Sequence, residues 1–161
     1  ETGESYEENA LLKARAWSEA LGMAALADDS GLEVFALGGS PGVHSARAVP
    51  GSDADRTIWL LSKMESVEDR RARFVSCIAV VFPDREDPLV YKGICSGTIS
   101  SKPCGSGGFG YDPYFLDPEI GLTGAEMPID QKGTRSHRGR AFAKLVIELT
   151  ERLGVHDAGR A

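Results

Sequence analysis

Two adjacent acids, Asp28 and Asp29, stand between a short apolar segment and the pair Ser30 and Gly31. Two carboxylates at the end of an apolar strand are not both ionised in a dry environment unless a cation lies beside them. A divalent metal is the natural cation, and ligation by oxygen alone favours Mg²⁺, which proteins bind through one or two carboxylates together with substrate phosphates. The alternative is a solvated turn, in which the two acids have no chemical role.

A glycine-rich segment, residues 105–110, carries Phe109 and is followed closely by Asp112. Its G-x-G-x-x-G spacing occurs in dinucleotide-binding turns, but such a turn opens a helix. Here an aromatic, strand-like segment follows, so we reject that interpretation. A ring beside a carboxylate suits a purine, because the ring stacks on the base and the carboxylate accepts its N–H groups. The alternative is the end of a hairpin with a phenylalanine in the core.

Cationic side chains gather at the predicted start of the last helix, where Ser136 is followed by His137 and Arg138 and preceded by Lys132. Positive charge in the first turn of a helix opposes the helix dipole, and such departures from local rules are commoner at functional sites. With the N–H groups of the helix N-terminus, these cations would bind an anionic or carbonyl-rich ligand. The alternative is a solvated basic end that pairs with nearby acids.

Lys13 lies one helical turn from Asn9 and Trp17, beside the apolar stripe of its predicted helix. That position either brings its ammonium to the edge of a cleft or leaves it as an ordinary surface lysine. The sequence contains no G-x-x-x-x-G-K-[ST] phosphate loop, no H-E-x-x-H and no G-x-S-x-G, and its three histidines are scattered. It therefore does not predict the nucleotide-binding, metalloprotease or serine hydrolase sites that these motifs form.

The elements that would position these residues are helices and extended segments, which predict an α/β fold with helices packed on a mixed sheet. A capping box that begins at Ser5 predicts a helix over 6–21, with Ala10, Ala14, Trp17 and Leu21 on one face. Residues 23–28 and 32–37 are predicted to be two strands, or a strand and an extended segment, joined at a polar bend. A buried central strand is predicted at 73–82, with its hairpin partner at 89–99. Two further helices are predicted, one capped by Ser52 or Asp53 with Ile58, Leu61 and Met64 inward, and one capped by Ser136 with Ala141, Leu145, Leu149 and Leu153 inward.

Composition limits the classes of protein to consider. The 161 residues are 42% apolar and 26% charged, which predicts one globular domain over 1–161. The net charge of −6, without a run of five like charges, excludes a basic stripe that tracks duplex nucleic acid. No stretch approaches 18 apolar residues, and three cysteines without C-x-x-C spacing favour a reducing environment. We therefore expect a cytoplasmic protein without a membrane partner.

Taken in order, the motifs resemble one family, the non-canonical purine nucleoside triphosphate pyrophosphatases, also called inosine triphosphatases or the Ham1-like family. The resemblance implies an elongated mixed sheet with flanking helices, divided into two lobes around a nucleotide cleft. It also implies a homodimer and Mg²⁺-dependent hydrolysis of ITP, dITP and XTP to the monophosphate and pyrophosphate, which cleanses the nucleotide pool. The matching segments are residues 1–3, 8–10, 13–14, 27–32, 37–39, 41–42, 45–47, 107–113, 132 and 136–139.

The resemblance also implies roles for single residues. Asp29 is similar to the family's catalytic carboxylate and metal ligand, and Glu1 stands in the segment that carries the other metal-binding acid. Lys13 resembles the catalytic lysine on the phosphate side, and Ser30 a neighbouring substrate contact. The predicted base pocket consists of Phe109, Gly110, Tyr111, Asp112, Lys132, His137 and Arg138.

Hydrogen-bond polarity predicts the selectivity of that base pocket. Donors such as Lys132, Arg138 and the N–H groups of the loop donate hydrogen bonds to the 6-oxo group of hypoxanthine or xanthine. The 6-amino group of adenine would instead place donor against donor and leave buried polar groups unpaired.

One departure from the family's pattern bears on activity. Family members open with a strand and a Ser/Thr-Gly-Asn-x-x-Lys loop that grips the phosphates, and neither is present in this sequence. We therefore expect residues to precede Glu1 in the native protein. The alternatives are a catalytically inactive module that binds purine nucleotides and a Maf-like nucleotide pyrophosphatase.

Overall fold

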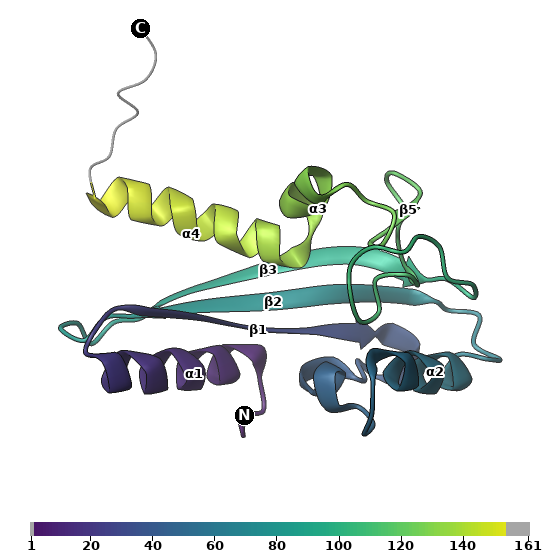
Figure 1. The fold of residues 1–161 in the computed structure, drawn as a ribbon, viewed down its shortest axis with the longest axis horizontal. Coiled ribbons are helices and arrows are strands. Elements are labelled where there is room, and N and C mark those ends of the chain that lie inside the picture. The colour runs from purple at the N-terminus through teal and green to yellow at the C-terminus, as the bar shows by residue number, and fades with distance from the viewer. Residues whose placement is uncertain (1, 154–161) are drawn as a thin grey trace, which may run out of the picture.

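The computed structural model describes residues 2–153, which form a long five-stranded sheet between two layers of helices (Figure 1). The strands are β1 (Ala25–Val34), β2 (Arg71–Val81), β3 (Leu89–Ile99), β4 (Phe115–Asp117) and β5 (Leu122–Thr123), and they lie in this order across the sheet. The α/β class and the elongated sheet with flanking helices are confirmed. The strand pairings differ from a mixed sheet, because all four pairings between the described strands are antiparallel.

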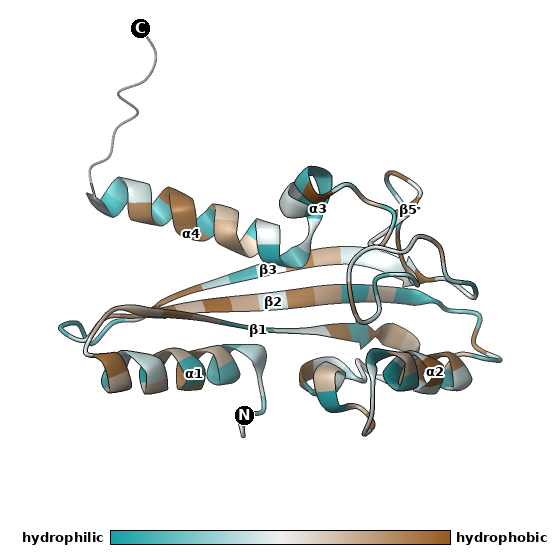
Figure 2. Ribbon diagram, in the orientation of Figure 1, coloured by the Kyte–Doolittle hydropathy of each residue, from teal (hydrophilic) through white to brown (hydrophobic). Residues whose placement is uncertain are grey.

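β2 is the central strand of the core, as its continuous apolar run predicts. Val75, Cys77 and Ala79 pack against the first helix, α1 (Tyr6–Leu21), on one face. Ile78 and Val80 pack against the last helix, α4 (His137–Leu153), on the other face. Figure 2 shows the strand in apolar colours over much of its length. Burial on both faces explains why the sequence of this strand does not alternate between apolar and polar residues.

α1 is confirmed at both ends. The Ser5 hydroxyl accepts a hydrogen bond from the Glu8 N–H at 3.2 Å, and Gly22 ends the helix in the left-handed conformation with φ of 63°. Ala10 and Ala14 are buried as predicted, but Trp17 is 60% exposed. The buried side of the helix is instead a line formed by every fourth residue. Leu21 is exposed like Trp17, and neither belongs to this line. The members of this line are Tyr6, Ala10, Ala14 and Ser18.

β1 corrects the prediction of two strands joined by a polar bend. Its ten residues form one strand that pairs with β2 from Ala25 opposite Val81 to Val34 opposite Ala72. Pairing with a long partner strand keeps the polar residues in the extended conformation, so tertiary context overrides their local preference for turns. The segment after Val34 also differs, because Phe35–Leu37 is a short 3₁₀ helix, η1.

Beyond η1, a second 3₁₀ helix, η2 (Gly42–Arg47), packs against β1. The carbonyl of Gly42 comes so close to Gly31 that a Cβ on Gly31 would lie 2.2 Å from it. Only glycine fits this contact.

α2 (Asp53–Lys63) begins at Ser52 with a complete capping box, as predicted. Met64 faces inward and Leu61 packs at the margin of the core, but Ile58 is 65% exposed, so that part of the prediction is wrong. The buried face of the helix lies along Thr57 and Leu60 instead. It covers the end of the sheet, where Leu32, Val34 and Phe115 form a second core.

The last two helices, α3 (Ile129–Arg135) and α4, lie together on one side of the sheet, and α1 and α2 lie on the other (Figure 1). Ser136 caps α4, since its hydroxyl accepts the N–H of Gly139 at 3.1 Å. Ala141 and Leu145 are buried and Leu149 packs beside them, as predicted. The side chain of Leu153 and the predicted stop at Gly154 lie outside the description. Over residues 2–153, none of the helices has the length and apolar character needed to cross a membrane.

Candidate active site

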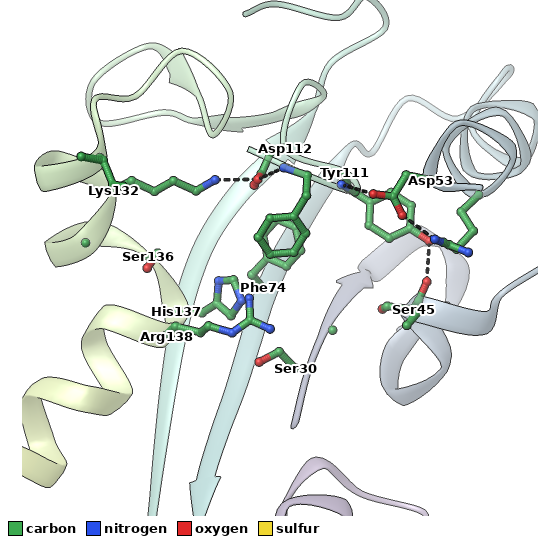
Figure 3. A pocket seen from close by; sticks show the side chains of 17 residues that line it. Ser30, Ser45, Asp53, Phe74, Tyr111, Asp112, Lys132, Ser136, His137 and Arg138 are labelled. Carbon is green, nitrogen blue, oxygen red and sulfur yellow. Dashed lines mark hydrogen bonds and ion pairs between the residues drawn. The ribbon is translucent and has the colours of Figure 1, made fainter. Parts of the chain in front are cut away.

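A pocket of about 360 Å³ opens between the α2 side of the molecule and the start of α4 (Figure 3). All eight residues that the sequence predicts to bind substrate line it, although they come from four separate segments of the chain. They are Ser30, Phe109, Gly110, Tyr111, Asp112, Lys132, His137 and Arg138. The fold therefore brings together the strand, the glycine-rich loop and the basic segment that the sequence singled out.

The ring of Phe109 is the exposed aromatic surface of this pocket. It is 64% exposed. The Nζ atom of Lys132 lies 5.7 Å from its centroid and the Cζ atom of Arg138 lies 5.6 Å from it. Cations at this distance are attracted to the ring electrostatically. A planar, carbonyl-bearing ligand would thus meet an aromatic face and two hydrogen-bond donors in one place.

Asp112 is buried and holds the glycine-rich loop in shape. Its Oδ2 atom accepts a hydrogen bond from the Phe109 N–H at 2.8 Å and forms an ion pair with Lys132 Nζ at 2.5 Å. Gly108 lies against the same carboxylate, where a Cβ would come within 2.2 Å of Oδ2, and it has a φ of 72°. Glycine is required at this position for both reasons.

The loop N–H groups are less available to a base than the sequence predicts. The Phe109 N–H donates to Asp112, and the Gly110 N–H donates to Asp53 Oδ2 at 2.8 Å. Lys132 and Arg138 are therefore the predicted donors that still face the pocket. Tyr111, which is buried, also ties the loop to η2, because its hydroxyl donates to the carbonyl of Ser45 at 3.1 Å.

His137 is neutral, which corrects its prediction as one of a group of cations. Its ring stacks on Phe74 with 4.8 Å between the centroids and 14° between the planes. Burial, followed by the neighbouring charge of Arg138, lowers the pKa of the His137 imidazole to about 3. The imidazole therefore supplies a flat, uncharged wall to the pocket rather than a positive charge.

Asp28 faces the pocket side of the sheet and pairs with Arg138, whose Nε lies 2.7 Å from Oδ2. The hydroxyl of Ser30 donates to the same oxygen at 2.9 Å. Burial raises the pKa of the Asp28 carboxyl, but the hydrogen bond and charge of Arg138 outweigh it, so the pKa lies below its usual value. Asp28 thus orients the guanidinium in the pocket.

Asp29 faces the opposite side of the sheet, against α1. Its Oδ1 accepts from Lys13 Nζ at 2.8 Å and its Oδ2 accepts from Asn9 Nδ2 at 3.3 Å. Neighbouring residues of a strand point to opposite faces, so Asp28 and Asp29 do not share one cation, contrary to the expectation from their adjacency in the sequence. The sheet separates the two acids.

The predicted site residues therefore form two groups. Asp29 and Lys13 lie on the α1 face, and the eight pocket residues lie around the cavity, whose lining includes neither Asp29 nor Lys13. The groups meet at consecutive residues of β1, Asp29 and Ser30. Glu1, the other predicted metal ligand, lies outside the described residues. Within 2–153 no cluster of three histidine, cysteine or acidic side chains could by itself hold a metal ion.

Several residues around the site were not singled out by sequence reasoning. Asn9 is fully buried beside Asp29, and its Oδ1 accepts from the Gly3 N–H at 2.9 Å. Asp53 is recognisable in the sequence only as a helix-capping residue, yet it lines the pocket, where it also pairs with Arg56. The available signal for Asn9 was an asparagine four residues before Lys13 in a predicted amphipathic helix.

Known proteins resemble this chain in sequence and in fold. The model of a family described as the Ham1 family matches residues 1–148. The chain belongs to the Ham1 family. This finding confirms the resemblance drawn from the ordered motifs.

Individual Ham1 relatives agree over most of the chain. A dITP/XTP pyrophosphatase of Symbiobacterium thermophilum is 53% identical over 151 residues, which are 92% of this chain and 76% of the relative. A dITP/XTP pyrophosphatase of Thermus thermophilus is 48% identical over 149 residues, 91% of this chain and 72% of the relative.

Solved Ham1 structures share the fold. The Staphylococcus aureus Ham1 protein has a TM-score of 0.90 at 45% identity, with 94% of this chain and 80% of that chain covered. A HAM1 protein from Coxiella burnetii has a TM-score of 0.89 at 41% identity, with 94% of this chain and 79% of that chain covered. The expected fold class is therefore confirmed by comparison as well.

Proposed function

We propose that this protein hydrolyses the non-canonical purine nucleotides dITP, XTP and ITP to the monophosphate and pyrophosphate, and so removes them from the nucleotide pool. The observation that carries the proposal is the convergence of Phe109, Lys132 and Arg138 on one cavity, with Asp29 one strand position from its edge. Membership of the Ham1 family and the names of the similar pyrophosphatases support it. They also disfavour an inactive nucleotide-binding module.

On the base side, the ring of Phe109 stacks on the purine while Lys132 and Arg138 donate hydrogen bonds to its 6-oxo group. Adenine would place its amino group against these donors and leave buried polar groups unpaired. A mismatch of this kind discriminates by about 10⁴-fold. The neutral ring of His137 adds a flat wall to the pocket and no further positive charge.

On the phosphate side, Asp29 fits a role as a magnesium ligand, because it offers only oxygen atoms and Mg²⁺ binds through one or two carboxylates plus phosphate oxygens. Asp29 would hold the ion together with Glu1, and the ion would neutralise phosphate charge and lower the pKa of a bound water. Asp29 also orients the attacking water as a hydrogen-bond acceptor. Lys13, at 2.8 Å from Asp29, donates to phosphate oxygens and offsets charge on the departing pyrophosphate.

The direct test incubates the purified protein with Mg²⁺ and dITP, XTP, ITP, dATP or dGTP and measures pyrophosphate and monophosphate. We expect equal amounts of both products from dITP, XTP and ITP and little from dATP. Binding of dITP without pyrophosphate release would support the inactive module instead. Faster hydrolysis of modified pyrimidine triphosphates than of dITP would support a Maf-like activity.

We also propose that the protein acts in the cytoplasm as a homodimer and has a nucleotide rather than a nucleic acid as its partner. The family resemblance supports this assembly. Light scattering of the purified protein in solution tests it, and a mass of one chain across the concentration range would contradict it.

A further inference from the structure

α3 carries Lys132 into the pocket, yet none of the helix's seven residues is buried. Its N-cap, Pro128, makes no side-chain capping bond, and Gly133 lies in its middle. Short helices in proteins are stabilised mainly by packing an apolar face, and α3 has no such buried face. Something other than apolar burial must therefore set the position of Lys132.

Two ion pairs, one helical turn apart, connect α3 to the segment around β4. Lys132 pairs with Asp112 inside the pocket. Arg135 pairs with Asp117 outside it, since neither Arg135 nor Asp117 belongs to the pocket lining. The second pair therefore acts on the pocket indirectly, through the backbone that it holds in place.

The Arg135 contact is the better buried of the two at its acidic end. The Nε atom of Arg135 lies 2.8 Å from Asp117 Oδ2, and the side chain of Asp117 is only 3% exposed. Arg135 also donates to Glu119 Oε2 at 2.5 Å, and the Glu119 N–H donates to Asp117 Oδ1 at 2.9 Å. One guanidinium thus joins the end of α3 to β4 and to the turn that follows it.

The residues after Arg135 connect it to a second cation of the pocket, Arg138. Ser136 caps α4, and Arg138 enters the pocket within that helix's first turn. α3 and α4 meet at Gly139, where a Cβ would lie 1.7 Å from the carbonyl of Gly133. Contact this close makes the two helix ends one unit, so a displacement of Arg135 would reach both Lys132 and Arg138.

We propose that Arg135 and Asp117 are a positioning pair that fixes the junction of α3 and α4 and thereby sets where Lys132 meets the purine. The inference rests on the proposed function. It predicts that loss of the pair weakens nucleotide binding more than it slows the chemical step, because the phosphate-side residues lie on the other face of the sheet.

The test uses Arg135→Gln and the double variant Arg135→Gln/Asp117→Asn. The single variant leaves a buried carboxylate without its partner and loses stability, whereas the double variant removes that charge and regains thermal stability. We expect both variants to raise KM for dITP about tenfold, the effect of losing one charge-assisted contact, with kcat within about twofold of wild type. Arg135→Lys should recover part of the lost affinity.

The matched control is Arg152→Gln, which removes a similar arginine–carboxylate contact, to Glu148 at 2.6 Å, at the far end of α4. We expect it to leave KM unchanged. A stable double variant whose KM equals that of wild type overturns the inference, as does an equal loss in Arg152→Gln.

Amide hydrogen exchange without nucleotide separates this inference from the proposed function. We expect the amides of residues 129–135 to exchange faster in the double variant than in wild type or Arg152→Gln. Unchanged exchange overturns the positioning pair. A wild-type protein that releases no pyrophosphate from dITP overturns the proposed function, and the exchange result then decides the pair on its own.

Discussion

The two faces of β1 hold their chemical groups by different means. On the α1 face, Lys13 and Asn9 reach Asp29 from a helix whose packing residues, Ala10 and Ala14, are fully buried. On the pocket face, the position of Lys132 depends on ion pairs, because the helix that carries it has no buried residue. The comparison indicates that apolar packing fixes the phosphate side, whereas polar tethers hold the base side and leave it easier to disturb.

The largest expected effect tests whether only one face performs the chemistry. Asp29→Asn should lower kcat for dITP about 10³-fold, since it removes a metal ligand and the charged acceptor that orients the attacking water. The control is Asp28→Asn on the neighbouring strand position, which we expect to act mainly on KM through Arg138. The rate of pyrophosphate formation in single-turnover experiments reports the chemical step.

Circular dichroism should show that both variants keep the fold. Turnover retained in Asp29→Asn would remove this residue from the mechanism. Equal loss of kcat in both variants would break the proposed division between the two faces.

A smaller effect tests the base side. Phe109→Ala should raise KM for dITP by about 10- to 100-fold with little change in kcat, because one stacked base contributes roughly that much binding. Phe142→Ala is the control, since Phe142 is also a partly exposed phenylalanine but lies outside this pocket. Steady-state kinetics with dITP and dATP measures affinity and selectivity together. A KM unchanged by loss of the ring would show that stacking does not bind the base.

The smallest effect concerns pH. The pKa of His137 is about 3 in the folded protein, below the ordinary value of 6.5. Between these two values the unfolded chain binds a proton that the folded chain does not, so stability is lost as pH falls from about 6.5 towards 3. His137→Phe retains a ring against Phe74 and removes this proton, so its melting temperature should fall less than that of wild type between pH 7 and pH 5.

The control for the His137 measurement is the interval from pH 8 to pH 9, where neither state of wild type takes up an appreciable fraction of this proton. The two proteins should behave in parallel there. Parallel behaviour below pH 6 as well would show that His137 is protonated in the folded protein.

Local sequence patterns predicted the elements whose signals are complete within a few residues. Ser5 and Gly22 bound α1 as expected, and the apolar run of β2 identified a strand buried on both faces. The bend expected at Asp28 was wrong because its conformation depends on β2, about 50 residues away in the chain. Trp17 was misplaced because the helix contacts the sheet along every fourth residue.

The site shows the same limit. All eight residues that the ordered motifs identified as substrate-binding lie in the pocket lining, because each motif keeps its residue types together in the sequence. The charge of His137 could not be read in this way, since burial against Phe74, 63 positions earlier, removes it. The hydrogen bond from the Gly110 N–H to Asp53 likewise joins residues 57 positions apart.

Alternation along β1 gives the alignment of this strand with β2 a functional meaning. Asp28 stands opposite Ile78 and Asp29 opposite Cys77. If β1 slid by a single residue, every side chain would change faces: a carboxylate would leave Lys13, and another would leave Arg138. An insertion or deletion of one residue in this strand would therefore move each of the two acids to the opposite face. An insertion or deletion of two residues would leave each acid on its original face, because side chains alternate with a period of two.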